Sequence, residues 1–319
     1  MGDKTMSFGQ DLTWRLEAGA FDLFTGLFRL LPVDAASWLG GALFRLFGPL
    51  TRTHALAEQN LRLAFPDRDE AWRRRILGDQ WESNGRTVAE FPMMDRLLPS
   101  TGRVEVVGAE RLAEIAAGGK PVVFVSGHFS NWEVMPAAIV NSGINCEITY
   151  RAANNPYVDR RIRDSRFRYG VRLFAPKGGD GAREMLTALG KGVSVALMND
   201  QKFNLGGVAA PFFGRPVMAA PGPTRLALRF GTVLQPMSVQ RTRGARFRVI
   251  VHPPIVLERT GDRTADIAEG VRRITAFVED RVRERPEEWF WVHRRWPPEA
   301  YASLAADGDQ ASTDSSAAP

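Results

Sequence analysis

The chain has 319 residues, 44% hydrophobic and 24% charged, so it can bury a hydrophobic core in one large domain with an appendage, or in two modest domains. Lysine and arginine outnumber aspartate and glutamate by 42 to 36, which favours an anionic partner such as nucleic acid, an anionic bilayer or a phosphorylated substrate. Cys146 is the only cysteine, which excludes an intrachain disulfide and a cysteine-based metal cluster.

The first fifty residues carry the pattern of two amphipathic helices. The first helix, over 21–31, is stopped by Pro32, and Asp34 can cap a second helix over 35–47. Neither apolar run reaches the roughly 20 uninterrupted residues that a membrane span needs. We therefore expect residues 1–50 to be membrane-associated helices that lie in the interface. A pair of core-packed helices and a single tilted span are the alternatives.

Residues 55–98 are predicted to be helical, and beyond Val104 the pattern changes. Short β-branched runs alternate with helical stretches, the former at 104–107, 122–125 and 193–197, the latter at 109–117, 132–142 and 180–190. Such alternation predicts an α/β fold with a largely parallel central sheet.

The last third of the chain adds two strands and a helix. The strands, 232–240 and 247–251, are expected to be neighbours joined by a basic turn, and the helix follows over 264–285. The end of the chain is rich in alanine, serine and aspartate, without apolar periodicity, which predicts a disordered tail. We therefore divide the chain into N-terminal helices at 1–50, a catalytic domain at 51–300 and a tail at 301–319.

A histidine and a glutamate follow the second predicted strand. The strand ends at Gly127, where the chain can turn sharply, and His128 comes next, at the edge where open α/β sheets place their ligand sites. Asn131, or the serine before it, can cap the following helix, which puts Glu133 in its first turn. On one continuous helix, residues five apart lie about 140° apart. With His128 in the loop, the two side chains can meet.

Such a pair has a clear chemical use. A neutral histidine can take the proton of an alcohol that attacks a thioester, and a carboxylate can fix its tautomer and stabilise the imidazolium. The alternative is that His128 satisfies backbone groups at the strand end while Glu133 favours a helix N-terminus. Because an isolated H-x(4)-E pattern is short and common, spacing alone does not decide between these interpretations.

The heptapeptide Gly-His-Phe-Ser-Asn-Trp-Glu at 127–133, after an apolar strand, resembles the motif of the late acyltransferases of lipid A biosynthesis, the lauroyl and myristoyl transferases. These are relatives of the H-x(4)-D glycerol-phosphate acyltransferases. Further blocks similar to this family follow in order at 60–66, 150–156, 198–201, 207–214 and 286–296. The resemblance thus extends from about residue 20 to 297.

The resemblance implies a glycerol-phosphate acyltransferase-like, mostly parallel sheet flanked by helices. It also implies transfer of a fatty acyl chain from acyl carrier protein, or from acyl-CoA, to a hydroxyl of a glycolipid at the cytoplasmic face of the inner membrane. His128 would be the general base and Glu133 its partner. Asp200, at the end of the strand 193–197, is a second acid that could approach the histidine. The partner of His128 is therefore Glu133, Asp200 or both.

Other positions are substrate-binding candidates. Arg151 would contact the substrate or the oxyanion, because its guanidinium suits phosphate and developing negative charge. Gln201 could donate a hydrogen bond, and Asn131 is also counted among the substrate-binding residues. The arginines between 160 and 172 could dock an acidic carrier protein or the phosphates of the lipid, and a solvated helix face is the alternative for many of them.

Several other functions are less well supported by the sequence. No metal-ligand spacing occurs, so we expect no metal, and no cofactor besides the acyl donor. Another glycolipid or an aminolipid is an alternative acceptor, because Ala152 and Ala153 stand where a different polar pair is expected. A noncatalytic membrane lipid-binding protein is the alternative from another class. Nucleic acid is not an expected partner, since the arginines belong to no recognisable nucleic-acid-binding module.

Overall fold

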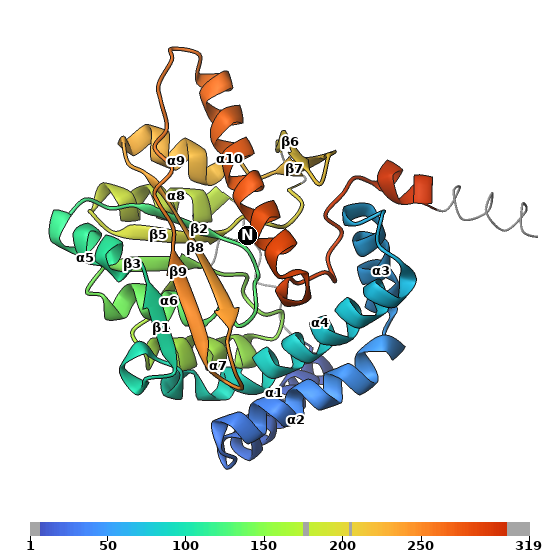
Figure 1. Ribbon diagram of the computed structural model, residues 1–319. Helices are drawn as coiled ribbons and strands as arrows, with labels where there is room; N and C mark the ends of the chain where they lie inside the picture. Colours follow the sequence, from blue (N-terminus) through green and yellow to red (C-terminus); the bar gives the residue numbers. More distant parts are fainter. Residues whose placement is uncertain (1–6, 175–178, 204–205, 305–319) are drawn as a thin grey trace, which may run out of the picture.

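A seven-stranded sheet forms the centre of the computed structural model, which describes residues 7–174, 179–203 and 206–304 (Figure 1). The strand order is β1-β9-β8-β2-β5-β3-β4, and all neighbours are parallel except β8 and β9. The strands are β1 (Val104–Val107), β2 (Val123–Ser126), β3 (Cys146–Thr149), β4 (Arg172–Phe174), β5 (Ser194–Met198), β8 (Leu234–Arg241) and β9 (Phe247–Val251). The predicted α/β fold with a largely parallel sheet is confirmed.

Helices cover both faces of this sheet. The α-helices of the described residues are α1 (Phe8–Arg29), α2 (Val33–Phe47), α3 (Arg52–Ala64), α4 (Glu70–Glu90), α5 (Ala109–Gly118), α6 (Val134–Asn141), α7 (Pro156–Phe167), α8 (Gly179–Gly190), α9 (Gly222–Phe230) and α10 (Arg263–Glu284). Side chains alternate along β2, as the period of a strand requires. Phe124 packs in the core shared with α6, while Val123 and Val125 pack with residues of α8 and α9. Because β2 is buried on both faces, all four of its residues are buried.

Several elements were missed or misplaced by the sequence patterns. β3 and β4 were not predicted, and neither was the hairpin of β6 (Val208–Phe212) and β7 (Arg215–Ala219). The strands of this hairpin contain proline and several alanines, which have low strand propensity. β8 and β9 are neighbours joined by a basic turn, as predicted, and they run antiparallel.

The N-terminal helices differ from the prediction in their starts. α1 begins at Phe8, where Ser7 caps it, much earlier than residue 21. The prediction that Asp34 caps α2 is wrong, because α2 begins at Val33 and Asp34 lies in its first turn. The Asp34 carboxylate instead pairs with Arg103 and accepts from the backbone N–H of Ala245.

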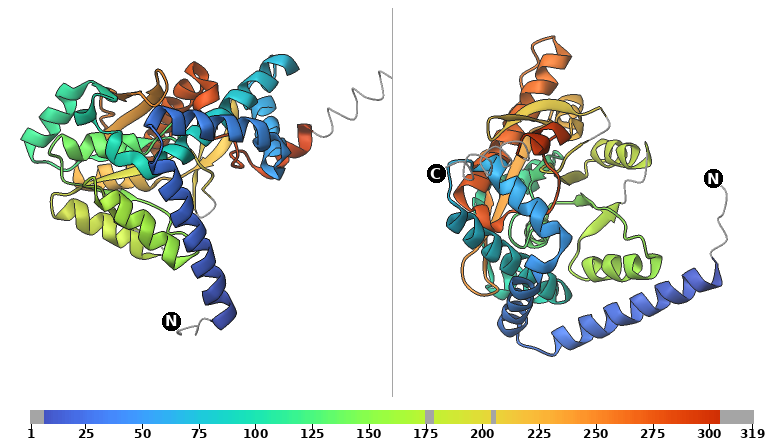
Figure 2. Two further views of the ribbon diagram at one scale, coloured as in Figure 1. Left: turned by 90° about the horizontal axis from the view of Figure 1, so that it is seen from below. Right: turned by 90° about the vertical axis from the view of Figure 1, so that its right-hand side faces the viewer.

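α2 lies along α4, while α1 projects from the body of the molecule (Figure 2). The α2–α4 contact is close because a Cβ atom on Gly40 would lie 2.5 Å from the carbonyl oxygen of Gly85, so the two backbones need glycine there. None of the helices in the described part of the chain combines the length and apolar character needed to cross a bilayer.

The predicted tail at 301–319 begins too early. Residues 301–304 are helical, and Tyr301 is buried, with its hydroxyl donating to Asn60 Oδ1 over 2.7 Å. The Tyr301 hydroxyl therefore ties the last described helix to α3. Residues 305–319 lie outside the described residues.

Candidate active site

His128 and Asp200 meet at one edge of the sheet. They follow β2 and β5, which are parallel neighbours with Ser126 opposite Met198, so their side chains emerge at the same carboxyl edge. The turn between strand and histidine needs a glycine. A Cβ atom on Gly127 would lie 2.8 Å from the ring of Phe129 and 3.3 Å from the Cβ of Asp200.

Two hydrogen bonds join His128 to Asp200. The imidazole Nδ1 lies 2.8 Å from Oδ1 of Asp200, and the backbone N–H of His128 donates to Oδ2 over 2.8 Å. The indole N–H of Trp289 donates to the same Oδ2 over 2.9 Å. A buried carboxylate with these donors accepts a hydrogen bond from Nδ1–H, which leaves the Nε2 of His128 as the free acceptor.

The electrostatics favour an ionised Asp200 and a basic His128. Burial alone would raise the pKa of the Asp200 carboxyl, but the charge of His128 and the hydrogen bonds from His128 and Trp289 hold it well below its usual range. Burial alone would lower the pKa of His128, but the Asp200 carboxylate raises it above its ordinary value, with a smaller contribution from Glu133. Aromatic rings wall the imidazole, with Trp132 at 5.0 Å and Phe290 at 6.3 Å between ring centroids.

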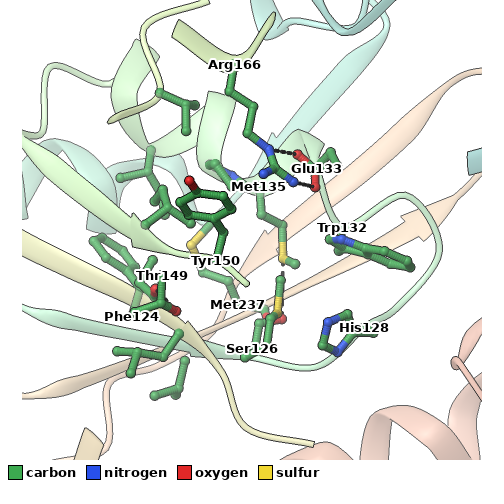
Figure 3. Close-up of a pocket in the computed structure, with 18 of the residues that line it drawn as sticks. Phe124, Ser126, His128, Trp132, Glu133, Met135, Thr149, Tyr150, Arg166 and Met237 are labelled. Carbon is green, nitrogen blue, oxygen red and sulfur yellow. Dashed lines mark hydrogen bonds and ion pairs between the residues drawn. The ribbon is translucent and has the colours of Figure 1, made fainter. Parts of the chain in front are cut away.

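Glu133 lies beside the site and pairs with an arginine (Figure 3). Its carboxylate receives two hydrogen bonds from the guanidinium of Arg166 on α7, one of them 2.9 Å long from Nε. Among the described residues, no hydrogen bond joins Glu133 to His128. Glu133 was expected in the first turn of its helix, but α6 begins one residue later, at Val134.

The loop from His128 to Glu133 has an unusual backbone. Ser130 has a φ of 45°, in the left-handed region, which costs on the order of 1 kcal/mol for a residue other than glycine. Its N–H donates to the carbonyl of Glu288 over 2.7 Å, and its carbonyl accepts from the Thr87 hydroxyl over 3.2 Å. The surrounding chain therefore holds this loop from two sides.

Asn131, which was predicted to bind substrate, supports the loop in the structure and does not line the cavity described below. Its side chain is fully buried, donates to Glu90 over 2.8 Å and accepts from the backbone N–H of Glu133 over 3.2 Å. The two remaining candidates lie at the surface. Arg151 is exposed at the rim of the cavity described next. Gln201 is exposed outside that cavity, and its main-chain carbonyl accepts from Arg295.

A narrow cavity of about 190 Å³ extends from His128 into the layer between the sheet and α6 (Figure 3). Its mouth is polar, with His128, Glu133, Arg151 and Arg166. Its deeper wall is apolar, formed by Phe124, Met135, Ile139, Ile148, Val171, Ala196, Leu197, Met198 and Met237. A cavity with a polar mouth and an apolar interior suits a hydrocarbon chain.

Two contacts of the site had no specific signal in the sequence. Trp289, which binds Asp200, was visible only as part of an aromatic block, and Arg166 only as one of many arginines. Among those arginines, Arg161 pairs with Asp22 of α1, whereas Arg163 and Arg168 are exposed. In the described residues, no group of three histidine, cysteine or acidic side chains could hold a metal ion.

The chain is similar to proteins of lipid A biosynthesis. The sequence model of the bacterial lipid A biosynthesis acyltransferases matches residues 14–297. The lipid A biosynthesis palmitoleoyltransferase of Escherichia coli (strain K12) is 26% identical over 274 residues, 83% of this chain and 86% of its own length. The lipid A biosynthesis lauroyltransferase of the same strain is 26% identical over 256 residues, 77% of this chain and 80% of its own.

One solved structure overlaps much of the chain. It is the 1-acyl-sn-glycerophosphate acyltransferase from Thermotoga maritima, which is 13% identical and covers 81% of this chain and 96% of its own. The TM-score between the two structures is 0.35.

Proposed function

Because the chain belongs to the bacterial lipid A biosynthesis acyltransferase family, and is therefore an acyltransferase, we propose that His128 is its general base. In this proposal, a fatty acyl chain moves from a thioester donor to a hydroxyl of a lipid A precursor. The observation that carries the proposal is the free Nε2 of His128 at the mouth of an apolar cavity, with Nδ1 held by the buried carboxylate of Asp200.

The proposed reaction needs only the two substrates and the side chains at the cavity mouth. The acceptor oxygen attacks the thioester carbonyl carbon while its proton passes to His128 Nε2. The carbon–sulfur bond of the tetrahedral intermediate then breaks, and the imidazolium returns the proton to the departing thiolate. No other cofactor enters this scheme.

The two carboxylates have different roles in the proposal. Asp200 fixes the tautomer of His128 and stabilises the imidazolium through a direct hydrogen bond. Glu133 adds negative charge near the imidazolium and, through Arg166, holds α7 beside the cavity. The exposed guanidinium of Arg151 at the rim can bind a phosphate or the developing oxyanion.

We further propose that acyl carrier protein is the donor. α7 lies beside the cavity mouth and carries exposed arginines at 160 and 163, and Arg168 follows its last turn. Such a surface suits an acidic protein that presents its acyl thioester to the cavity. Acyl-CoA is the competing donor, and a direct comparison of the two thioesters decides between them.

We also propose that α1 and α2 bind the cytoplasmic face of the inner membrane. Large apolar side chains are exposed on both helices, at Phe8, Leu12, Leu16, Leu23 and Leu27 of α1, at Leu30 directly after it, and at Trp38, Leu43, Leu46 and Phe47 of α2. On α1, the spacings of three, four and seven residues put these side chains on one side of the helix. An amphipathic helix of this kind lies in the plane of the interface.

The test of the chemistry is the variant His128→Ala in purified full-length protein. Acyl transfer to a lipid A precursor, followed by mass spectrometry of the product, should fall at least about 100-fold, while the unfolding temperature stays close to that of the unmodified protein. The assay uses acyl carrier protein and CoA thioesters in parallel, and we expect faster turnover with the former. Unchanged turnover in a folded His128→Ala protein would exclude the general-base role.

A further inference from the structure

Glu90, the last residue of α4, places a buried carboxylate behind the active-site loop. It is 0% exposed and does not line the cavity. One oxygen, Oε1, accepts from the Ser37 hydroxyl of α2 over 2.6 Å. The other, Oε2, accepts from the Asn131 side chain over 2.8 Å. The guanidinium of Arg241, at the end of β8, donates to both oxygens.

The Glu90 carboxylate forms an ion pair with the Arg241 guanidinium. Arg241 supplies the compensating positive charge, and its side chain is only 11% exposed. A buried ion pair tolerates the loss of one partner poorly, because the other is left without solvation. The Glu90–Arg241 ion pair is consequently held in place, and the Asn131 side chain donates a hydrogen bond to it.

Hydrogen bonds connect Glu90 and α4 to the loop between His128 and Glu133. The Asn131 side chain also accepts a hydrogen bond from the backbone N–H of Glu133. The same amide therefore links Glu90 to the second half of the loop. One turn earlier on α4, the Thr87 hydroxyl donates to the carbonyl of Ser130, whose φ is positive. Side chains of α4 therefore contact two consecutive residues of the loop, Ser130 and Asn131.

We propose that Glu90 is a positioning residue for acyl transfer. Through Asn131 it fixes the loop that sets His128 against Asp200, without touching either substrate itself. This inference rests on the proposed role of His128 as the base. Because Glu90 lies in a helix 38 positions before His128 in the sequence and belongs to none of the motifs, only the three-dimensional contacts reveal it.

The experiment compares Glu90→Gln with Ser37→Ala in the full chain. Glutamine keeps the shape of the side chain, but in either orientation its N–H₂ group faces a donor of Arg241, and in one orientation it also faces the Asn131 amide. We expect kcat to fall at least tenfold, with KM for the acyl donor changed less than twofold. Ser37→Ala removes a hydrogen bond to the same carboxylate on the side of α2, and its kcat should stay within twofold of the unmodified protein.

A double variant and a second readout separate positioning from mere stability. Glu90→Gln combined with Asn131→Asp restores one amide and one carboxylate across the contact. The kcat of this double variant should be at least threefold higher than that of Glu90→Gln alone. Hydrogen exchange followed by mass spectrometry should show faster amide exchange at 128–133 in Glu90→Gln than in Ser37→Ala. Hydrogen exchange needs no acyl transfer to lipid A. It therefore tests the positioning role of Glu90 separately from the proposed function.

Two outcomes would overturn the positioning role. One is an unchanged kcat and unchanged exchange at 128–133 in folded Glu90→Gln, together with an inactive His128→Ala. The other is an equal loss of kcat in Ser37→Ala, since the effect would then follow general weakening around α4.

Discussion

The site is assembled from two regions that are held in different ways. The strand-end region consists of His128, Asp200 and Trp289, which come from the ends of two parallel strands and from the C-terminal segment. The cover consists of α1 and α7, which lie side by side along one flank of the molecule (Figure 2). The strand-end region has a carboxylate that is 3% exposed, whereas α7 has no fully buried side chain.

Different forces follow from this difference. Within the cover, α1 is fastened to α7 by polar contacts at the surface, such as Arg161 with Asp22 and the Tyr157 hydroxyl with Asp11. Half-exposed ion pairs contribute about 0–1 kcal/mol each. Hydrogen bonds to a buried charge contribute about 1.5–3 kcal/mol. We infer that the chemistry depends on a rigid edge of the sheet, while the cover can shift to admit long substrates.

The largest expected effect comes from Asp200→Asn in the strand-end region. Loss of the carboxylate leaves the His128 tautomer unfixed and its imidazolium unpaired, so kcat should fall by about 100-fold or more. The base must be neutral, so activity falls as the pH drops through the His128 pKa, which Asp200 raises. Without that charge, burial dominates and the pKa falls. The acid limb of the kcat profile should therefore move to lower pH.

Glu133→Gln is the matched control for this prediction. Glu133 raises the pKa of His128 less than Asp200 does, so the acid limb should move in the same direction by a smaller amount. pH profiles of kcat for the two variants make the comparison. A larger displacement in Glu133→Gln than in Asp200→Asn would show that Glu133 is the main partner of the base.

A smaller effect is expected where the cover meets the cavity. Arg166→Met leaves the Glu133 carboxylate, 11% exposed, without its partner, which should lower the free energy of unfolding by up to about 3 kcal/mol. KM for the acyl donor should rise by roughly tenfold, equivalent to about 1.4 kcal/mol of binding, because α7 no longer borders the cavity mouth in a fixed position. Denaturant titration and steady-state kinetics measure the two quantities.

The control for Arg166→Met is Arg161→Met on the same helix. Arg161 pairs with Asp22 at side-chain exposures of 35% and 52%, so its loss should cost less than about 1 kcal/mol and leave KM nearly unchanged. Equal changes in KM and in the free energy of unfolding would mean that the loss of any contact of α7 has the same effect. The Arg166–Glu133 ion pair would then have no specific role at the cavity.

The same contrast explains what the sequence could predict. β2 and β5 carry runs of β-branched residues, so their ends, and hence the approach of Asp200 to His128, were visible from strand periodicity and the edge rule of parallel sheets. The partners were not visible. Trp289 lies 89 positions from Asp200, and Arg166 lies 33 positions from Glu133. Such pairings depend on how whole elements pack, which no local pattern contains.

The smallest expected effect lies at the outer side of the cover. Leu23 is 65% exposed on α1, and Leu23→Glu should weaken binding to phosphatidylglycerol-containing vesicles about fivefold, equivalent to about 1 kcal/mol of lost apolar burial. Thr13→Glu adds the same charge to the same helix off the leucine side and should weaken binding less. Because no described residue of α1 lines the cavity, kcat on detergent-dispersed substrate should be unchanged in both variants. Loss of that activity in Leu23→Glu would mean that lipid contact and chemistry are coupled through α7, and the two regions could no longer be treated as separable.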